Sequence, residues 1–287
     1  MEWKRGTLTR IAVALCALVS AAAAAEPPRR VVSMNLCTDQ LALLIGAPGQ
    51  VVSVSDWAAK PSASNMVEAA AALPANGASA EQVFLMKPDL VLAGTFTNRV
   101  AVDMLRRLGL RVEQLSPARS VDGVKAAIRE MGALLGRDAR AEAVVAAFEA
   151  ALAAEAERAA SLGREEAAYH YANNYTSGAD TLAAEAMDHA GFDNAAEALG
   201  LTGAARLPLE IFVMRRPFVI RTETLSGAET GRAYETRSHP ALAALGSDGR
   251  SAVVPERWQI CGTPFIRRTV AALIDARLAA QASTGAE

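Results

Sequence analysis

The chain has 287 residues, of which 52% are hydrophobic and 21% are charged, with 29 lysines and arginines against 31 aspartates and glutamates. The formal net charge of −2 and the lack of a basic stripe argue against a nucleic-acid-binding protein, because such proteins depend on clustered positive charge. A chain of this length usually divides into two folding units, so we expect two lobes.

The first 25 residues have the composition of a secretory signal peptide. Lys4, Arg5 and Arg10 precede an apolar run from Ile11 to Ala25 that ends in small residues. The run is too short for a bilayer span, which needs ~20 apolar residues. We therefore predict cleavage after Ala25 and a soluble protein located in the periplasm.

Short runs rich in β-branched residues alternate with longer segments of helical spacing along the rest of the chain. This alternation indicates βα units around mostly parallel sheets. Seven strands are predicted, at Val31–Asn35, Val51–Ser55, Leu90–Ala93, Val112–Leu115, Tyr169–Asn173, Phe218–Arg221 and Ala252–Val254. Glycines that follow apolar periodic stretches predict helix ends at Gly46, Gly109, Gly136, Gly191 and Gly246.

Residues 120–162 have no strand signal and are dominated by strong helix formers. Ser120 suits an N-cap, and a long helix is predicted from Ala139 to Leu162. The alternative is a surface helix of one large domain. We favour an α/β fold with two βα lobes joined by a single long backbone helix. The expected division is a signal peptide at 1–25, an N-terminal lobe at 26–136, the linking helix at 137–162 and a C-terminal lobe at 163–287.

Two segments, one in each predicted lobe, have a similar sequence pattern. Glu81 is followed seven residues later by Pro88, and Glu210 is followed seven residues later by Pro217. Each segment predicts a short apolar helix that stops at basic residues before the proline and leads directly into a strand.

Cys37 and Cys261 remain after signal-peptide removal, in an oxidising compartment that permits a disulfide. Three interpretations stay open: two small buried apolar residues, a bridge between the lobes, or thiolates that contact a metal centre. A bridge requires Cα atoms within ~7 Å of each other.

These features together resemble the periplasmic binding proteins of iron-siderophore and cobalamin importers. The most specific pieces are Arg30–Leu41, Lys87–Ala93 and Leu105–Val112, and the second lobe matches more loosely through Tyr175–Gly178, the Glu210 segment and Trp258. The resemblance implies two lobes joined by one long helix. It also implies that a surface glutamate on each lobe, Glu81 and Glu210, docks onto arginines of a membrane permease. Alternatively, each glutamate only stabilises a helix N-terminus, and Ser79 with Gln82 forms a capping box.

Ligands of open α/β sheets bind beyond the carboxyl ends of the strands, so the residues that follow each strand are the candidates. The ligand-binding candidates are Asn35, Cys37, Thr38, Trp57, Thr95 and Phe96 in the first lobe and Tyr175, Arg221, Trp258 and Cys261 in the second. Flat apolar faces with a few polar groups suit a large chelate. Alternatively, Trp57, Phe96 and Trp258 cap the sheet edges as local core.

We predict a monomeric, non-enzymatic component of an ABC importer. It would carry a ferric siderophore or a corrinoid to a permease in the inner membrane, with no permanent cofactor and with iron or cobalt arriving inside the ligand. No motif for a nucleophile elbow, a zinc protease or a phosphate loop is present, and the three histidines lack metal-ligand spacing. The alternatives are an exported haem-binding protein of the same fold and a periplasmic interaction module without a small ligand.

Overall fold

A computed structural model describes residues 26–223, 233, 235–236, 239–245 and 249–284. The predicted signal peptide and Gly246 lie outside these residues. Within the described part of the chain, no helix is both long enough and apolar enough to cross a membrane.

Two parallel sheets form the two halves of the molecule. The five-stranded sheet has the order β3-β2-β1-β4-β5 and the four-stranded sheet has the order β11-β10-β6-β8. We call the parts that contain them the N-terminal half and the C-terminal half. The N-terminal strands are β1 (Val31–Ser33), β2 (Val51–Ser55), β3 (Ala75–Asn76), β4 (Leu90–Gly94) and β5 (Val112–Leu115). The C-terminal strands are β6 (Glu165–Tyr169), β8 (Phe192–Asn194), β10 (Phe218–Glu223) and β11 (Ser251–Pro255), with a separate antiparallel pair β7 (Tyr175–Ser177) and β9 (Ala204–Arg206).

Ten α-helices cover these sheets in the part of the chain that the structure describes. Those in or beside the N-terminal half are α1 (Leu36–Ile45), α2 (Val67–Ala71), α3 (Ala80–Leu85), α4 (Arg99–Arg107) and α5 (Val121–Leu135). The others are α6 (Asp138–Ala159), α7 (Leu182–His189), α8 (Leu209–Arg215), α9 (Pro240–Leu245) and α10 (Arg267–Thr284). The α/β class with parallel sheets is confirmed.

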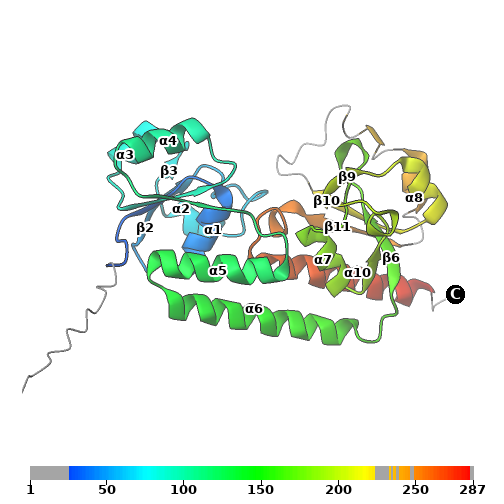
Figure 1. Ribbon diagram of the computed structural model, residues 1–287. Helices are drawn as coiled ribbons and strands as arrows, with labels where there is room; N and C mark the ends of the chain where they lie inside the picture. Colours follow the sequence, from blue (N-terminus) through cyan, green and yellow to red (C-terminus); the bar gives the residue numbers. More distant parts are fainter. Residues whose placement is uncertain (1–25, 224–232, 234, 237–238, 246–248, 285–287) are drawn as a thin grey trace, which may run out of the picture.

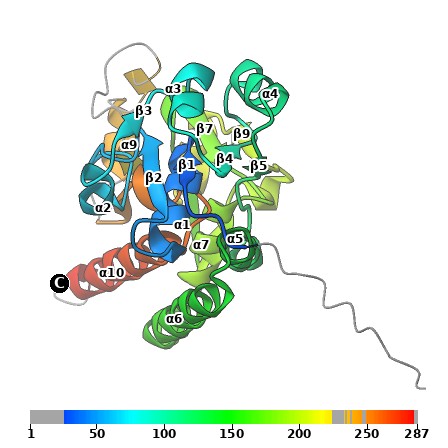
Figure 2. The same cartoon turned by 90° about the vertical axis from the view of Figure 1, so that its left-hand side faces the viewer.

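The long helix α6 lies beneath both sheets (Figure 1). Its 22 residues span roughly 33 Å at 1.5 Å per residue. Ser120 caps α5 as predicted, because its hydroxyl accepts a hydrogen bond from the Gly123 backbone N–H. Gly136 ends α5 in the left-handed conformation, with φ 65°, and the chain then turns back into α6. Figure 2 shows α6 below α5, on the side of the molecule opposite α3 and α4. The predicted lobe boundaries remain a proposal for the domain division.

The largest hydrophobic core is continuous between the two halves. Buried side chains of α1, α5, α6, α7 and α10 pack in one cluster with the inner faces of both sheets. The α6 side chains in it recur at helical spacing, at Ala141, Val144, Val145, Phe148 and Leu152. Smaller clusters fill the opposite faces, under α3 and α4 in one half and under α8 and α9 in the other. The halves therefore share one packed layer, which α6 crosses.

The repeated glutamate-to-proline segments fold alike. Helix α3 leads into β4, and helix α8 leads into β10. The basic residue before each proline leaves the helical conformation, with φ 49° at Lys87 and φ 48° at Arg216. The prediction of a short helix that feeds a strand is confirmed in both copies.

One predicted strand is displaced. The strand predicted at Tyr169–Asn173 runs instead from Glu165 to Tyr169 as β6, and residues 172–174 form a 3₁₀ turn. The two glutamates at its start, Glu165 and Glu166, interrupt the apolar pattern from which a strand is predicted. Each of them pairs with an arginine of the same half, Glu165 with Arg250 and Glu166 with Arg215, so their charges are compensated at the sheet edge.

Candidate ligand-binding site

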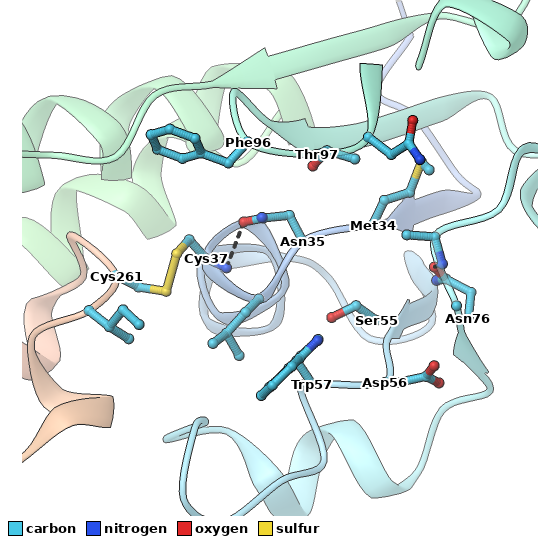
Figure 3. A pocket seen from close by; sticks show the side chains of 15 residues that line it. Met34, Asn35, Cys37, Ser55, Asp56, Trp57, Asn76, Phe96, Thr97 and Cys261 are labelled. Atoms are coloured by element: carbon cyan, nitrogen blue, oxygen red, sulfur yellow. Dashed lines mark hydrogen bonds between the residues drawn. A yellow bond between two sulfur atoms is a disulfide. The ribbon is translucent and has the colours of Figure 1, made fainter. Parts of the chain in front are cut away.

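A pocket of about 430 Å³ lies where the carboxyl ends of the N-terminal strands meet, against a loop of the C-terminal half (Figure 3). Its wall contains residues at the ends of β1, β2, β3 and β4 or directly after them, and two residues that follow β11. They include Met34, Asn35, Cys37, Ser55, Asp56, Trp57, Asn76, Ala78, Phe96, Thr97, Ile260 and Cys261. This is the edge at which parallel α/β sheets bind ligands.

A second pocket of about 250 Å³ adjoins the first. The two share Asn35, Cys37, Phe96 and Ile260 in their walls, and Thr38 and Thr95 line the second pocket alone. The shared residues therefore form the boundary between two compartments of one site.

Asn35 is held in place at the start of α1. Its side-chain oxygen caps the helix by accepting a hydrogen bond from the Cys37 backbone N–H at 3.0 Å. Gly94 makes room for this side chain, because a Cβ at Gly94 would lie 2.9 Å from the Asn35 Cγ. The asparagine is therefore fixed by both its own helix and the neighbouring strand.

Trp57 and Phe96 lie on opposite sides of the first pocket (Figure 3). Their exposed fractions are 45% and 84%, which excludes the alternative that these two rings are local core. The ammonium of Lys60 lies 3.6 Å from the centroid of the Trp57 ring in a cation–π contact. The two aromatic rings offer apolar surface to a bound molecule.

A buried carboxyl group lies behind the pocket wall. Asp39 on α1 is fully buried, and it accepts hydrogen bonds from the Ser55 hydroxyl and from the Ser55 backbone N–H. Burial raises the pKa of Asp39 to about 7, against the lowering effect of hydrogen bonds from Ser33 and Ser55. Ser55 itself lines the first pocket, so Asp39 is joined to the pocket wall through this serine.

Cys37 and Cys261 form a disulfide across 224 residues of sequence, with Cα atoms 5.0 Å apart. Cys37 belongs to α1 of the N-terminal half and Cys261 follows β11 of the C-terminal half. Of the three interpretations left open by the sequence, the bridge between the halves is the one that the structure contains. The disulfide forms part of the pocket wall (Figure 3).

Thiol titration checks this bridge. A chain that begins at Glu26 contains only Cys37 and Cys261. We expect no titratable thiol when this protein is unfolded without reductant, and two thiols after reduction. Two thiols before reduction, in protein purified from an oxidising compartment, would contradict the bridge.

The structure brings together the N-terminal candidates and Cys261, whereas three candidates of the C-terminal half do not line the pockets. Tyr175 is on β7 beneath the guanidinium of Arg206, at 5.4 Å from the ring centroid. Arg221 is within β10, and Trp258 is in a 3₁₀ turn. None of these three lines either pocket, so their contact with a ligand stays a prediction. Thr38 lines the second pocket but is buried, with its hydroxyl bonded to Ser33 and Asn35.

Several pocket residues were missed from the sequence. Asn76 is the second and last residue of β3, a strand too short to show any alternation. Its side-chain amide donates hydrogen bonds to the carbonyls of Ser33 and Val54 and to the Ser53 hydroxyl, each at 2.9 Å. The available sequence signal was the Asn-Gly pair at 76–77, which is typical of a turn.

Glu81 and Glu210 occupy matching places on the two halves. Each is exposed in the first turn of its helix, α3 or α8. The capping interaction at Ser79 is present, because its hydroxyl accepts from the Gln82 backbone N–H at 3.2 Å. The reciprocal contact differs from a capping box, since the Gln82 side chain accepts from the Gly77 backbone N–H instead.

Among the described residues, no group of three or more His, Cys, Asp or Glu side chains is arranged to hold a metal ion. His170 is fully buried and bonds through Nε2 to the Asn174 side chain at 3.0 Å.

Comparisons with known proteins give a consistent result. A family model described as periplasmic binding protein matches residues 31–245. A cobalamin-binding protein of Halobacterium salinarum is 32% identical over 199 residues, which cover 68% of this chain and 54% of that protein. The chain thus spans about half the length of the curated relative it matches.

Solved structures share the fold at lower sequence identity. A periplasmic heme binding protein from Pseudomonas aeruginosa has a TM-score of 0.70 at 22% identity, over 87% of this chain and 92% of that chain. The periplasmic vitamin B12 binding protein BtuF of Vibrio cholerae has a TM-score of 0.64 at 18% identity, over 89% and 98%.

Proposed function

Because this chain belongs to the periplasmic binding protein family, whose members bind solutes and are not enzymes, we propose that it is the solute-binding component of an ABC importer for a metal chelate. The pocket between Trp57 and Phe96, at the carboxyl ends of the N-terminal strands, carries this proposal. The ligand enters the pocket with its metal already coordinated, and the complex then delivers it to a permease in the inner membrane.

The ligand we propose is a corrinoid of the cobalamin type. The cobalamin-binding relative supports this choice. The pocket chemistry agrees with it, because exposed aromatic rings suit a macrocycle while Asn35, Asn76 and Thr97 provide polar groups for amide side chains. Asp56 adds a carboxylate to the wall, which disfavours the highly anionic ferric catecholates.

Retention of colour tests this proposal. The protein is mixed separately with hydroxocobalamin, haemin and ferric hydroxamates, desalted, and examined by ultraviolet-visible spectroscopy. We expect hydroxocobalamin to be retained. Retention of haemin alone would support the second candidate function, a haem-binding protein. Several solved structures of this fold carry the name heme-binding protein. Retention of none would favour an interaction module without a small ligand.

The aromatic pair should contribute measurably to affinity. We expect Trp57→Ala and Phe96→Ala each to weaken hydroxocobalamin binding by about tenfold, because a buried aromatic contact contributes on the order of 1.4 kcal/mol. Isothermal titration calorimetry measures the change. Phe84→Ala is the matched control, since Phe84 is 42% exposed but lines neither pocket. Equal losses in all three variants would place the binding site elsewhere.

Docking to the permease is proposed through Glu81 and Glu210. One helical turn after each glutamate stands a highly exposed apolar side chain, Leu85 at 77% and Met214 at 78%. Residues four apart share one face of a helix, so each half presents a carboxylate beside an apolar side chain. Both helices lie on the side of the molecule opposite α6 (Figure 1). In the docked complex the permease would cover these two apolar side chains together with the carboxylates.

A further inference from the structure

The loop after β11 comes from the C-terminal half but is attached to the N-terminal half. We call residues 257–262 the wall segment, because Ile260 and Cys261 line the first pocket and Ile260 and Gly262 line the second. The disulfide from Cys261 to Cys37 is its covalent attachment to α1.

Asn65 provides a second, noncovalent attachment. Its side-chain amide donates to the Arg257 carbonyl at 2.6 Å and to the Gln40 side chain at 2.9 Å. Gln40 lies on α1, one turn after Cys37, so both attachments lead to the same helix. The Arg257 guanidinium also donates to the Pro61 carbonyl at 3.1 Å, and Arg268 donates to the Asn65 side-chain oxygen at 3.3 Å.

The other attachments of the wall segment leave it little freedom. The Tyr169 hydroxyl of β6 donates to the Gln259 side chain at 2.9 Å, which ties the segment to the C-terminal sheet. Gly262 lies against the loop before α5, where a Cβ on this glycine would be 2.3 Å from the Ala118 side chain. The segment is thus clamped between the two halves at the pocket itself.

We infer that the Cys37–Cys261 disulfide and Asn65 act together as a positioning unit that holds the wall segment against α1 and keeps the pocket preformed. The halves cannot separate at this edge while the bridge is intact. The ligand enters at the open side, between Trp57 and Phe96, and meets a wall that is already in place. A preformed wall raises affinity, because the population that can bind is not diluted by open forms.

Distances between the halves test this inference without any ligand. A ketone-bearing noncanonical residue at exposed positions 107 on α4 and 214 on α8 accepts spin labels and leaves both cysteines intact. Pulsed electron paramagnetic resonance should give one narrow distance distribution for the oxidised protein. We expect a broader distribution, shifted to longer distances, for the double variant Cys37→Ser with Cys261→Ser, and an intermediate distribution for Asn65→Ala.

Reduction of the folded wild-type protein is the matched control. Dithiothreitol should reproduce the distribution of the double serine variant and should not change that variant. Superimposable distributions of oxidised, reduced and variant protein would overturn the inference. Circular dichroism confirms that each sample is folded, and the reduced wild type decides the question if the double variant does not fold.

The effect on ligand binding depends on the proposed function, whereas the distances do not. If loss of the bridge lowers the binding-competent fraction from nearly all molecules to about one tenth of them, hydroxocobalamin binding should weaken about tenfold. Absence of hydroxocobalamin binding in both oxidised and reduced protein would refute the corrinoid proposal, and the distances would still decide the positioning role. Equal affinities in the two states, with hydroxocobalamin bound, would refute the gain in affinity.

Discussion

Replacement of both Glu81 and Glu210 by alanine is expected to reduce uptake of the ligand to background while the Kd for the ligand stays unchanged. Both carboxylates are exposed, on helices α3 and α8, and lie outside the two pockets. Charges at the rim of a contact act on the partner rather than on a separate binding site. The measurements are uptake of labelled ligand in cells that depend on the importer, and calorimetry on the purified variant.

A matched pair of acidic residues serves as the control. Glu68 and Glu197 are also exposed, each in the first turn of a helical segment, one in each half. Alanine at these two positions should leave uptake intact. This pair therefore controls for the loss of two exposed carboxylates, one from each half. Loss of ligand affinity in the Glu81 and Glu210 double variant would count against a docking role.

Wild-type stability is expected to fall, relative to that of Asp39→Asn, as the pH rises from about 4 to about 7. The pKa of Asp39 is raised from 3.8 to about 7 by burial, so in this window the folded protein holds a proton that the unfolded chain has released. Stability then falls with rising pH by about 1.4 kcal/mol per unit, and the effect of this group is complete above pH 7. Asparagine keeps an oxygen that can accept from the Ser55 backbone N–H, and it does not ionise.

Urea unfolding at several pH values measures this difference. Subtracting the Asp39→Asn curve from the wild-type curve removes the contributions of other titrating groups. Asp56→Asn controls for the loss of a nearby carboxylate, because Asp56 lines the first pocket and is exposed whereas Asp39 lies behind the wall and is fully buried. Parallel curves for wild type and Asp39→Asn would show that Asp39 ionises at its ordinary pKa.

Most of the fold could be predicted because its signals are local. Six of the seven predicted strands coincide with strands of the two sheets, and the helix ends at Gly109, Gly136 and Gly191 have the left-handed φ that was expected. Gly46 also ends a helix but with φ −57°. Strands β3, β7, β8 and β9 have two or three residues each and were not predicted. In segments this short, pairing with neighbouring strands decides the conformation, and periodicity cannot report it.

The N-terminal side of the site was more predictable than its C-terminal side. Asn35, Cys37, Trp57 and Phe96 follow strands that lie side by side in one parallel sheet, so the strand order brings them together. In the C-terminal half, the same reasoning found Cys261 and missed Ile260. Tyr175, Arg221 and Trp258 follow the same rule of strand ends, yet the residues of that half that reach the pocket are Ile260 and Cys261.

The amino-acid sequence by itself determined the α/β class, the long helix, the repeated glutamate segments and the family, because each depends on the order and spacing of neighbouring residues. Only the tertiary structure decided that Cys37 and Cys261 are bridged, that Asp39 is a buried acid behind the pocket, and that the wall segment is clamped to α1. These features depend on how two distant stretches pack through a shared core, and on the desolvation that the packing imposes.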